Sequence, residues 1–395
     1  MKINKKRVIT YIITVLLSLA YLLLGNSYVS GGLELFSSEA ELSVRAKVIR
    51  VSRTEETADP YMEAAGIESE PNRVIHFEAK ALSGENKGET IKALQLIDGY
   101  MSNITHPVEK GDNVYLYYSN EGEYYGSWLF ADYDRLGKII LLALIFFASL
   151  ILFGRIQGIN TIVSLSLTCA AVVMVFIPSV LAGKNIYLWS VITCVFTIIM
   201  TLVIVYGVDK KSIGAALGCF AGIGAAGVLT LIMDRAMKLT GYLSSDSFQL
   251  TQLNIDIRAV IFGAIIIGAM GAIMDISISI SSSLFEVREK AESITTADLI
   301  HSGFNIGRDI LGTMSNTLVL AYIGSSLSVL LVLAVYSPSP LELLNRERII
   351  VELLQSLVGI TAILGTIPLT SVICGFLYGG KNEEKYLVVH KEEEE

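Results

Sequence analysis

Residues 258–284 read RAVIFGAIIIGAMGAIMDISISISSSL, and this stretch decides the class of fold. About 20 predominantly apolar residues in a helix are enough to cross a hydrocarbon core about 30 Å thick. This run is longer than that, and its only charged residues are Arg258 at its start and Asp275 inside it. The stretch therefore predicts a transmembrane helix that carries one carboxylate.

Similar runs lie on both sides of this stretch, at residues 8–24, 138–153, 160–181, 186–208, 212–233, 310–336 and 350–378. The whole chain has a mean hydropathy of +0.58, with 52% hydrophobic and only 17% charged residues. A chain this apolar needs lipid around most of its surface. We therefore expect an α-helical polytopic membrane protein with about eight transmembrane helices.

The distribution of positive charge predicts the orientation of these helices. If the basic N-terminus (Lys2, Lys5, Lys6 and Arg7) is cytoplasmic, thirteen Lys and Arg fall on cytoplasmic segments, against seven on the outer helix ends and the short outer loops. Cytoplasmic loops of membrane proteins carry this kind of excess. The sequence thus predicts that both termini are cytoplasmic.

The chain divides into four parts: an N-terminal membrane helix (1–30), a β-rich domain outside the cytoplasm (40–135), a seven-helix bundle (136–380) and an acidic cytoplasmic tail (381–395). Within the second part, short alternating or β-branched runs at 42–51, 73–82, 90–96 and 113–118 are separated by turn signals. This spacing predicts a small β-barrel of the OB type. The chain has no run of Lys and Arg interleaved with aromatics, so nucleic acid is not an expected partner.

The polar side chains of the last three runs predict a functional layer. Gly268, Gly271, Asp275 and Ser279 share one helical face, so we expect Asp275 to be held in a contact with a neighbouring helix. Thr313, Ser315 and Asn316 on the next run and Thr366 on the last lie at a similar predicted depth, on the order of 12 to 18 Å from the cytoplasmic edge. Polar groups inside a membrane mark substrate or ion pathways. A structural clamp and a contact with a protein partner are the alternatives.

Two other features give structural expectations. Gly214, Gly218 and Gly222 are spaced by four, which favours a close-packing seam over a flexible gate. Residues 285–306 predict an amphipathic loop on the membrane surface, and the next span is expected to begin at Arg308 and Asp309.

Two blocks carry a resemblance to a known family. Residues 268–283, and residues 303–324 with the sequence GFNIGRDILGTMSNTLVLAYIG, are similar to the YibE/F family of bacterial multi-pass membrane proteins. The resemblance extends over nearly the whole chain and implies a bacterial cytoplasmic membrane. It implies no reaction, ligand or functional residue.

From these observations we expect a transporter or channel-like permease for an unidentified small solute or ion. The alternative is a non-transporting scaffold or sensor whose outer domain binds an envelope protein, and a homo-oligomer is compatible with both. An enzyme is not expected, since no HExxH, Gly-x-Ser-x-Gly or P-loop pattern occurs. The four cysteines all lie in apolar runs, so we expect no metal site and no cofactor.

Overall fold

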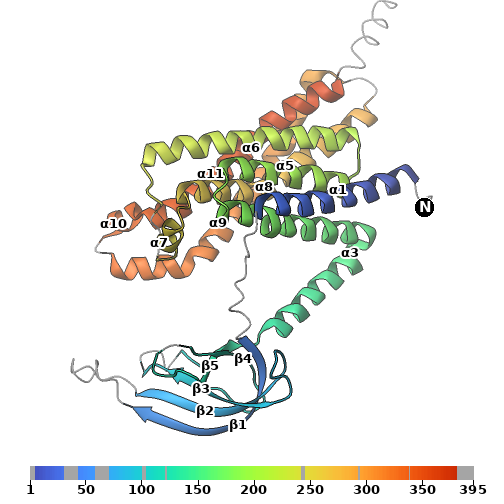
Figure 1. The fold of residues 1–395 in the computed structure, drawn as a ribbon. Helices are drawn as coiled ribbons and strands as arrows, with labels where there is room; N and C mark the ends of the chain where they lie inside the picture. The colour runs from blue at the N-terminus through green and yellow to red at the C-terminus, as the bar shows by residue number, and fades with distance from the viewer. Residues whose placement is uncertain are drawn as a thin grey trace, which may run out of the picture. The chain divides into compact units, whose positions relative to one another are not determined.

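A computed structural model describes residues 5–30, 43–57, 71–99, 104–120, 122–241, 245–291, 294–337 and 339–379. The acidic tail predicted at 381–395 lies outside these residues. The chain forms two compact units, one of Glu34–Ser149 and one of Met1–Leu33 with Leu150–Glu395. The first unit is built on a β-barrel and the second is helical (Figure 1).

The first unit is a closed barrel of five strands: β1 (Ser43–Thr57), β2 (Asn72–Ala81), β3 (Thr90–Ile97), β4 (Asn113–Tyr118) and β5 (Trp128–Tyr133). The strand order is β1-β2-β3-β5-β4, closed by the antiparallel pair β1–β4, and β3 and β5 are parallel. The barrel and the four predicted strands are confirmed. β5 was not predicted, although it lies between β3 and β4 and is needed to complete the barrel.

The alternation of side chains explains the barrel's interior. Alternate residues of each strand point inward, and Phe77, Val114 and Leu116 are almost fully buried there. Gln95 takes one inward position of β3, where its amide donates to the His106 carbonyl (2.9 Å) and accepts from the Val108 N–H (2.8 Å). A buried amide is tolerated because both of its polar atoms have partners.

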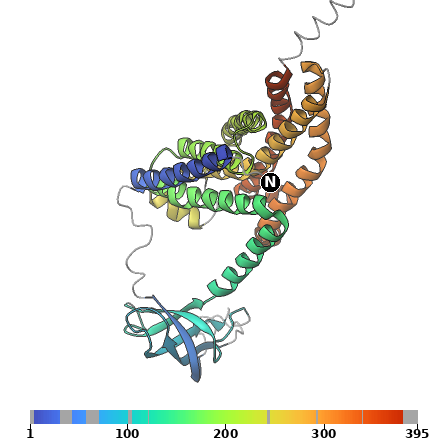
Figure 2. The same cartoon turned by 90° about the vertical axis from the view of Figure 1, so that its right-hand side faces the viewer.

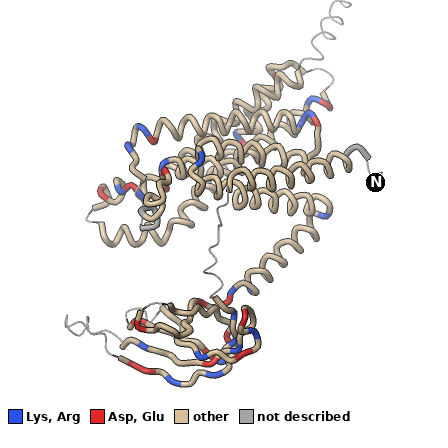
Figure 3. Tube along the Cα trace, viewed as in Figure 1, with Lys and Arg blue, Asp and Glu red and all other residues tan. Residues whose placement is uncertain are grey.

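The second unit contains most of the long helices, and its principal elements are α1 (Lys5–Ser30), α5 (Ile186–Val205), α6 (Lys210–Met237), α8 (Ile257–Lys290), α9 (Thr296–Tyr336) and α11 (Glu347–Gly379). Two short helices, α7 (Ser245–Gln252) and α10 (Pro340–Asn345), lie between them in the sequence. Charged residues gather mostly at helix ends and on the barrel, while helix centres are largely uncharged (Figure 3). This distribution is the one expected of helices surrounded by lipid.

The described residues contain seven apolar helical stretches long enough to cross a membrane. One of them, Leu136–Leu181, is 46 residues long and combines α3 (Leu136–Ala171), the π-helical turn η3 (Val172–Phe176) and α4 (Ile177–Leu181). At 1.5 Å per residue it is about 69 Å long, more than twice the thickness of a hydrocarbon core. Its helical geometry is interrupted at Arg155, which has φ 50° and ψ −125°.

Residues 285–306 were predicted as a loop, and most of them are helical instead. α8 continues to Lys290, and α9 begins at Thr296, well before the predicted start at residue 310. A capping box explains this start: Thr295 accepts from the Asp298 N–H (3.2 Å), and the Asp298 side chain accepts from the Thr295 N–H (3.4 Å). Arg308 and Asp309 therefore lie inside α9 and not at its first turn.

Three helices form the centre of the second unit, since α6, α8 and α11 all pack against one another. α9 packs along α11 and also touches α8, α5 packs on α8, and α1 packs on α5 (Figures 1 and 2). The inner face of α8 is filled by fully buried isoleucines, among them Ile273, Ile276 and Ile280. The β-branched face of α8, and not its small-residue face, is thus the one in the core.

Candidate functional site

Glycines on α6 face hydroxyl groups on α11 throughout the centre of the bundle. A Cβ atom added to Gly214, Gly218 or Gly222 would lie within 3.0 Å of the hydroxyl oxygen of Tyr378, Thr370 or Thr366, respectively. Only a residue without a side chain leaves room for these hydroxyls. The close-packing seam predicted for the three glycines is therefore observed, and its partner is α11.

Serines of α8 complete this arrangement. The Ser277 hydroxyl lies 3.3 Å from that of Thr370. Ser281 donates to the Lys211 carbonyl (2.6 Å), and its oxygen lies 2.7 Å from the Tyr378 hydroxyl, which is also 3.2 Å from the Lys210 carbonyl. We refer to Gly214, Gly218, Gly222, Ser277, Ser281, Thr366, Thr370 and Tyr378 together as the glycine–hydroxyl seam. The serines and threonines of the seam are 0% exposed.

The seam is a polar column inside an apolar bundle. From Tyr378 to Thr366 it rises over twelve residues of α11, or about 18 Å. At its upper end Thr366 donates back to the Ala362 carbonyl of its own helix (2.6 Å). The hydroxyls of the seam form hydrogen bonds between helices and lie next to the glycine backbone of α6. If the helices separate, these hydroxyls can bind a polar solute instead.

The seam ends at a broad hollow where α6 begins and where α8 and α11 end. The hollow has a volume of about 670 Å³ and is lined by Lys210, Phe285, Arg288, Glu289, Ala291, Phe376, Leu377 and Tyr378. Tyr378 thus lines the hollow while its hydroxyl belongs to the seam. We call this side of the bundle the basic end.

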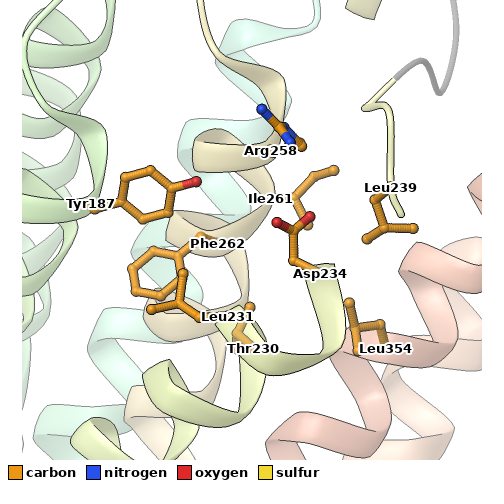
Figure 4. Close-up of a pocket in the computed structure, with 9 residues that line it drawn as sticks. All are labelled: Tyr187, Thr230, Leu231, Asp234, Leu239, Arg258, Ile261, Phe262 and Leu354. Atoms are coloured by element: carbon orange, nitrogen blue, oxygen red, sulfur yellow. The ribbon is translucent and has the colours of Figure 1, made fainter. Parts of the chain in front are cut away.

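A much smaller pocket lies at the opposite end, between α5, α6, α8 and α11 (Figure 4). The Tyr187 hydroxyl and the Asp234 carboxylate point into it, and Arg258 lies above them (Figure 4). Its volume of about 10 Å³ has room for one water molecule. The pocket is polar at its mouth, but too small for a larger solute.

Apolar side chains separate this pocket from the seam. Gly222 and Thr230 are eight residues apart on α6, or about 12 Å. The buried residues of this interval include Ala226, Ile266 and Val358, which belong to the main hydrophobic cluster of the bundle. The polar column therefore borders the hollow at the basic end, through Tyr378, and is separated from the small pocket by an apolar layer.

Beyond this layer, Glu347 ties the start of α11 to the segment that follows α6. Its carboxylate accepts from the Thr240 N–H (2.7 Å), the Thr240 hydroxyl (2.6 Å) and the Gly241 N–H (2.6 Å). The first turn of α11 is thereby fixed to the segment that follows α6. Bonds to a charged acceptor are among the stronger hydrogen bonds in proteins.

The structure does not bring the six predicted site residues together. Thr366 is in the seam, but Asp275 is exposed on the outer face of α8, with Ser279 half-buried one turn away. On α9, Thr313 and Asn316 are exposed and Ser315 is half-buried. Within the described part of the chain, no hydrogen bond or ion pair joins Asp275 to another residue. Asp275 nevertheless lies close enough to Tyr206, which follows α5, and to Cys219 of α6 to interact electrostatically with both.

The comparisons with known proteins bear on the helical unit. The family model described as YibE/F-like protein matches residues 142–380. This range includes α5, α6, α8, α9 and α11, and with them the whole seam. No curated protein and no solved structure matches the chain. The chain belongs to the YibE/F-like family.

Proposed function

We propose that this chain is a membrane permease for a small polar solute or ion, and that the glycine–hydroxyl seam is its route. The observation that supports this most directly is the seam itself: eight small or hydroxyl-bearing residues from three helices form a buried polar column that reaches a hollow at one end. Polar groups inside a membrane are costly and concentrate along pathways.

The proposed topology has eight transmembrane passes in a bacterial cytoplasmic membrane. The segment Leu136–Leu181 crosses twice, with its turn near Arg155, because its length suits two passes and not one. The basic end of the bundle and both termini are cytoplasmic, in keeping with the positive-inside rule. The barrel, which has the strand order of an OB fold, is then on the outer side.

In this proposal the structure corresponds to a closed state that is accessible from the cytoplasm. A solute enters from the hollow and is held among the hydroxyls of Ser277, Thr370 and Thr366. Passage requires α6 to move away from α11 and the apolar layer around Ala226 to part. A seam of glycines suits such movement, since it has no side chains to interdigitate.

The test is flux in proteoliposomes that contain the full chain. The probes are K⁺, protons followed with a pH-sensitive dye, and glycerol and urea followed by osmotic swelling. Thr370→Val combined with Ser277→Ala keeps the shape of the seam and removes two hydroxyls. We expect flux of the transported probe to fall about tenfold, which corresponds to the loss of roughly one hydrogen bond in the rate-limiting step.

Ser190→Ala is the matched control. Its hydroxyl is also fully buried, but it belongs to α5 and donates to its own helix at Ile186 (2.7 Å). We expect this variant to transport normally. Equal flux through the seam variant and this control, in protein that remains monodisperse, would exclude the seam as the route.

A scaffold or sensor is the second candidate, and the close packing of the seam favours it. Hydroxyls that fill glycine notches also stabilise a static helix bundle. This function predicts no protein-dependent flux of any probe, together with specific capture of an envelope protein by the barrel. The two functions are therefore distinguished by the same proteoliposomes.

A further inference from the structure

The hollow at the basic end combines positive charge with exposed apolar surface. Lys210 at the start of α6 and Arg288 near the end of α8 both line it, and among the described residues Glu289 is the single acidic side chain in its lining. Lys211 lies next to the hollow, with its ammonium 5.1 Å from the centre of the Phe285 ring. Within the described residues, none of these three cations forms an ion pair.

Arg288 is held in place by a neutral partner. Its Nε donates to the carbonyl of Tyr378 (3.1 Å), in the last turn of α11. This bond uses one of the five N–H groups of the guanidinium and orients the group at the wall of the hollow. The guanidinium keeps donors and a full positive charge for a ligand, because a carbonyl does not neutralise it.

Apolar side chains continue the hollow along the bundle. Phe376 is 70% exposed and Leu377 is 37% exposed, and both line it together with Phe285. A free anion gains nothing from such a surface. A phospholipid uses both parts, because its phosphate needs cations and its acyl chains need apolar surface on the membrane side.

We propose that this hollow binds an anionic phospholipid, with its phosphate between Lys210 and Arg288 and its acyl chains along Phe376 and Leu377. Basic pockets between transmembrane helices are recognised sites for acidic headgroups. The inference does not depend on transport and requires only that the bundle lies in a bilayer. Because Tyr378 belongs to both the hollow and the seam, a lipid bound here contacts the residue that ends the polar column.

The test is lipid binding to the purified full chain in detergent, measured by native mass spectrometry with phosphatidylglycerol and phosphatidylcholine of identical acyl chains. We expect phosphatidylglycerol to bind more tightly. Lys210→Gln should weaken its binding about fivefold, the effect expected for one cation at a membrane surface. Lys210 is exposed and only its backbone carbonyl is bonded, so this variant keeps the fold even if Arg288→Gln does not.

Arg235→Gln is the matched control, because Arg235 is an exposed cation in the last turn of the same helix. We expect it to bind both lipids as the unmodified chain does. Equal loss of phosphatidylglycerol in Arg235→Gln and Lys210→Gln would show a general charge effect and overturn the site. Displacement of the lipid by millimolar inorganic phosphate would also overturn it, since the ligand would then be a free anion.

The acidic residues Glu392–Glu395 offer a competing ligand from the chain itself. Binding of phosphatidylglycerol that occurs only after all four are changed to glutamine would show that the tail takes the hollow and would overturn the lipid proposal. We expect the unmodified chain to bind phosphatidylglycerol without this change, and Phe376→Ser to weaken that binding because the acyl chains lose apolar surface.

Discussion

Replacing Gly218 by alanine tests the central packing of the bundle. An added Cβ would lie 2.9 Å from Cγ2 and 3.0 Å from Cβ of Thr370, and closer still to its Oγ1, whereas ordinary van der Waals contact begins near 3.4 Å. Thr370 cannot yield freely, because it is fully buried and its hydroxyl lies 3.3 Å from that of Ser277. Overpacking of this kind costs about 1–3 kcal/mol.

Gly224 provides the matched control on the same helix. A Cβ at Gly224 meets no atom within 4 Å, so Gly224→Ala gains helix propensity of up to about 1 kcal/mol without a clash. Because both changes gain the same helix propensity, the two alanine variants differ by the cost of the clash, about 1–3 kcal/mol, although their chemistry is identical. Thermal unfolding in a fixed detergent, followed by circular dichroism at 222 nm, should place Gly218→Ala below the unmodified chain and Gly224→Ala at or above it.

A second substitution shows whether the cost arises from Thr370. Thr370→Ala removes both of the γ atoms that the new methyl group approaches, so the double variant Gly218→Ala with Thr370→Ala should be more stable than the two single effects added together. Equal melting temperatures for Gly218→Ala and Gly224→Ala, or strict additivity in the cycle, would refute the close contact of α6 with α11.

Three further outcomes follow from contacts at other places. Glu347→Gln should destabilise the bundle by about 1–2 kcal/mol, because a charged acceptor of three hydrogen bonds becomes neutral, whereas Glu342→Gln should change stability by less than about 0.5 kcal/mol because its ion pair is on the surface. Gln95→Leu should lower barrel stability by about 2 kcal/mol, since it leaves the buried N–H of Val108 without its partner, whereas the His106 carbonyl still accepts from the Tyr133 hydroxyl (2.8 Å). Fluorescence of Trp128, in a chain that also carries Trp189→Phe, follows this unfolding. Asp275→Asn should leave the melting temperature and probe flux unchanged between pH 5 and 9, because the carboxylate is outside the seam, and a pH-dependent loss of flux would return Asp275 to the route.

Much of the fold was accessible from the sequence because its signals are strong and local. Long apolar runs predict membrane helices, and alternation with turn residues predicts the barrel. The strand β5 was missed because its sequence, WLFADY, follows an aromatic cluster and resembles an interfacial anchor. The start of α9 was missed although Thr295 and Asp298 form a readable capping signal, because hydropathy alone places the helix at its apolar part.

The orientation of α8 explains why the predicted site and the seam share only Thr366. Helical spacing places Gly268, Gly271 and Asp275 on one face, but spacing does not say whether that face is turned inward. In α6 the small-residue face is inward and meets α11, while in α8 the isoleucine face is inward and Gly268, Gly271 and Asp275 are exposed. The choice depends on which helices are neighbours, and that information is not local.

The seam nonetheless left a trace in the sequence. Thr366, Thr370, Cys374 and Tyr378 recur every four residues on α11, as Gly214, Gly218 and Gly222 do on α6, and Ser277 and Ser281 have the same spacing on α8. Three stripes with one period fit helices that lie alongside one another with matching rows of side chains. Comparison of stripes between helices, and not within one, is the sequence signal that could have identified these residues.

The position of α11 has a consequence for how the protein is made. It is the last long helix among the residues that the structure describes, yet it supplies the hydroxyls that fill the notches of α6, whose final residue is synthesised about 110 residues before α11 begins. At ribosomal rates of about 5–20 residues per second, the glycine face of α6 waits roughly 5 to 20 seconds in the bilayer for its partner. During that interval nascent α6 presents an open row of backbone to any other helix nearby, so its biogenesis should benefit from an insertase or chaperone that shields this face until α11 has been synthesised.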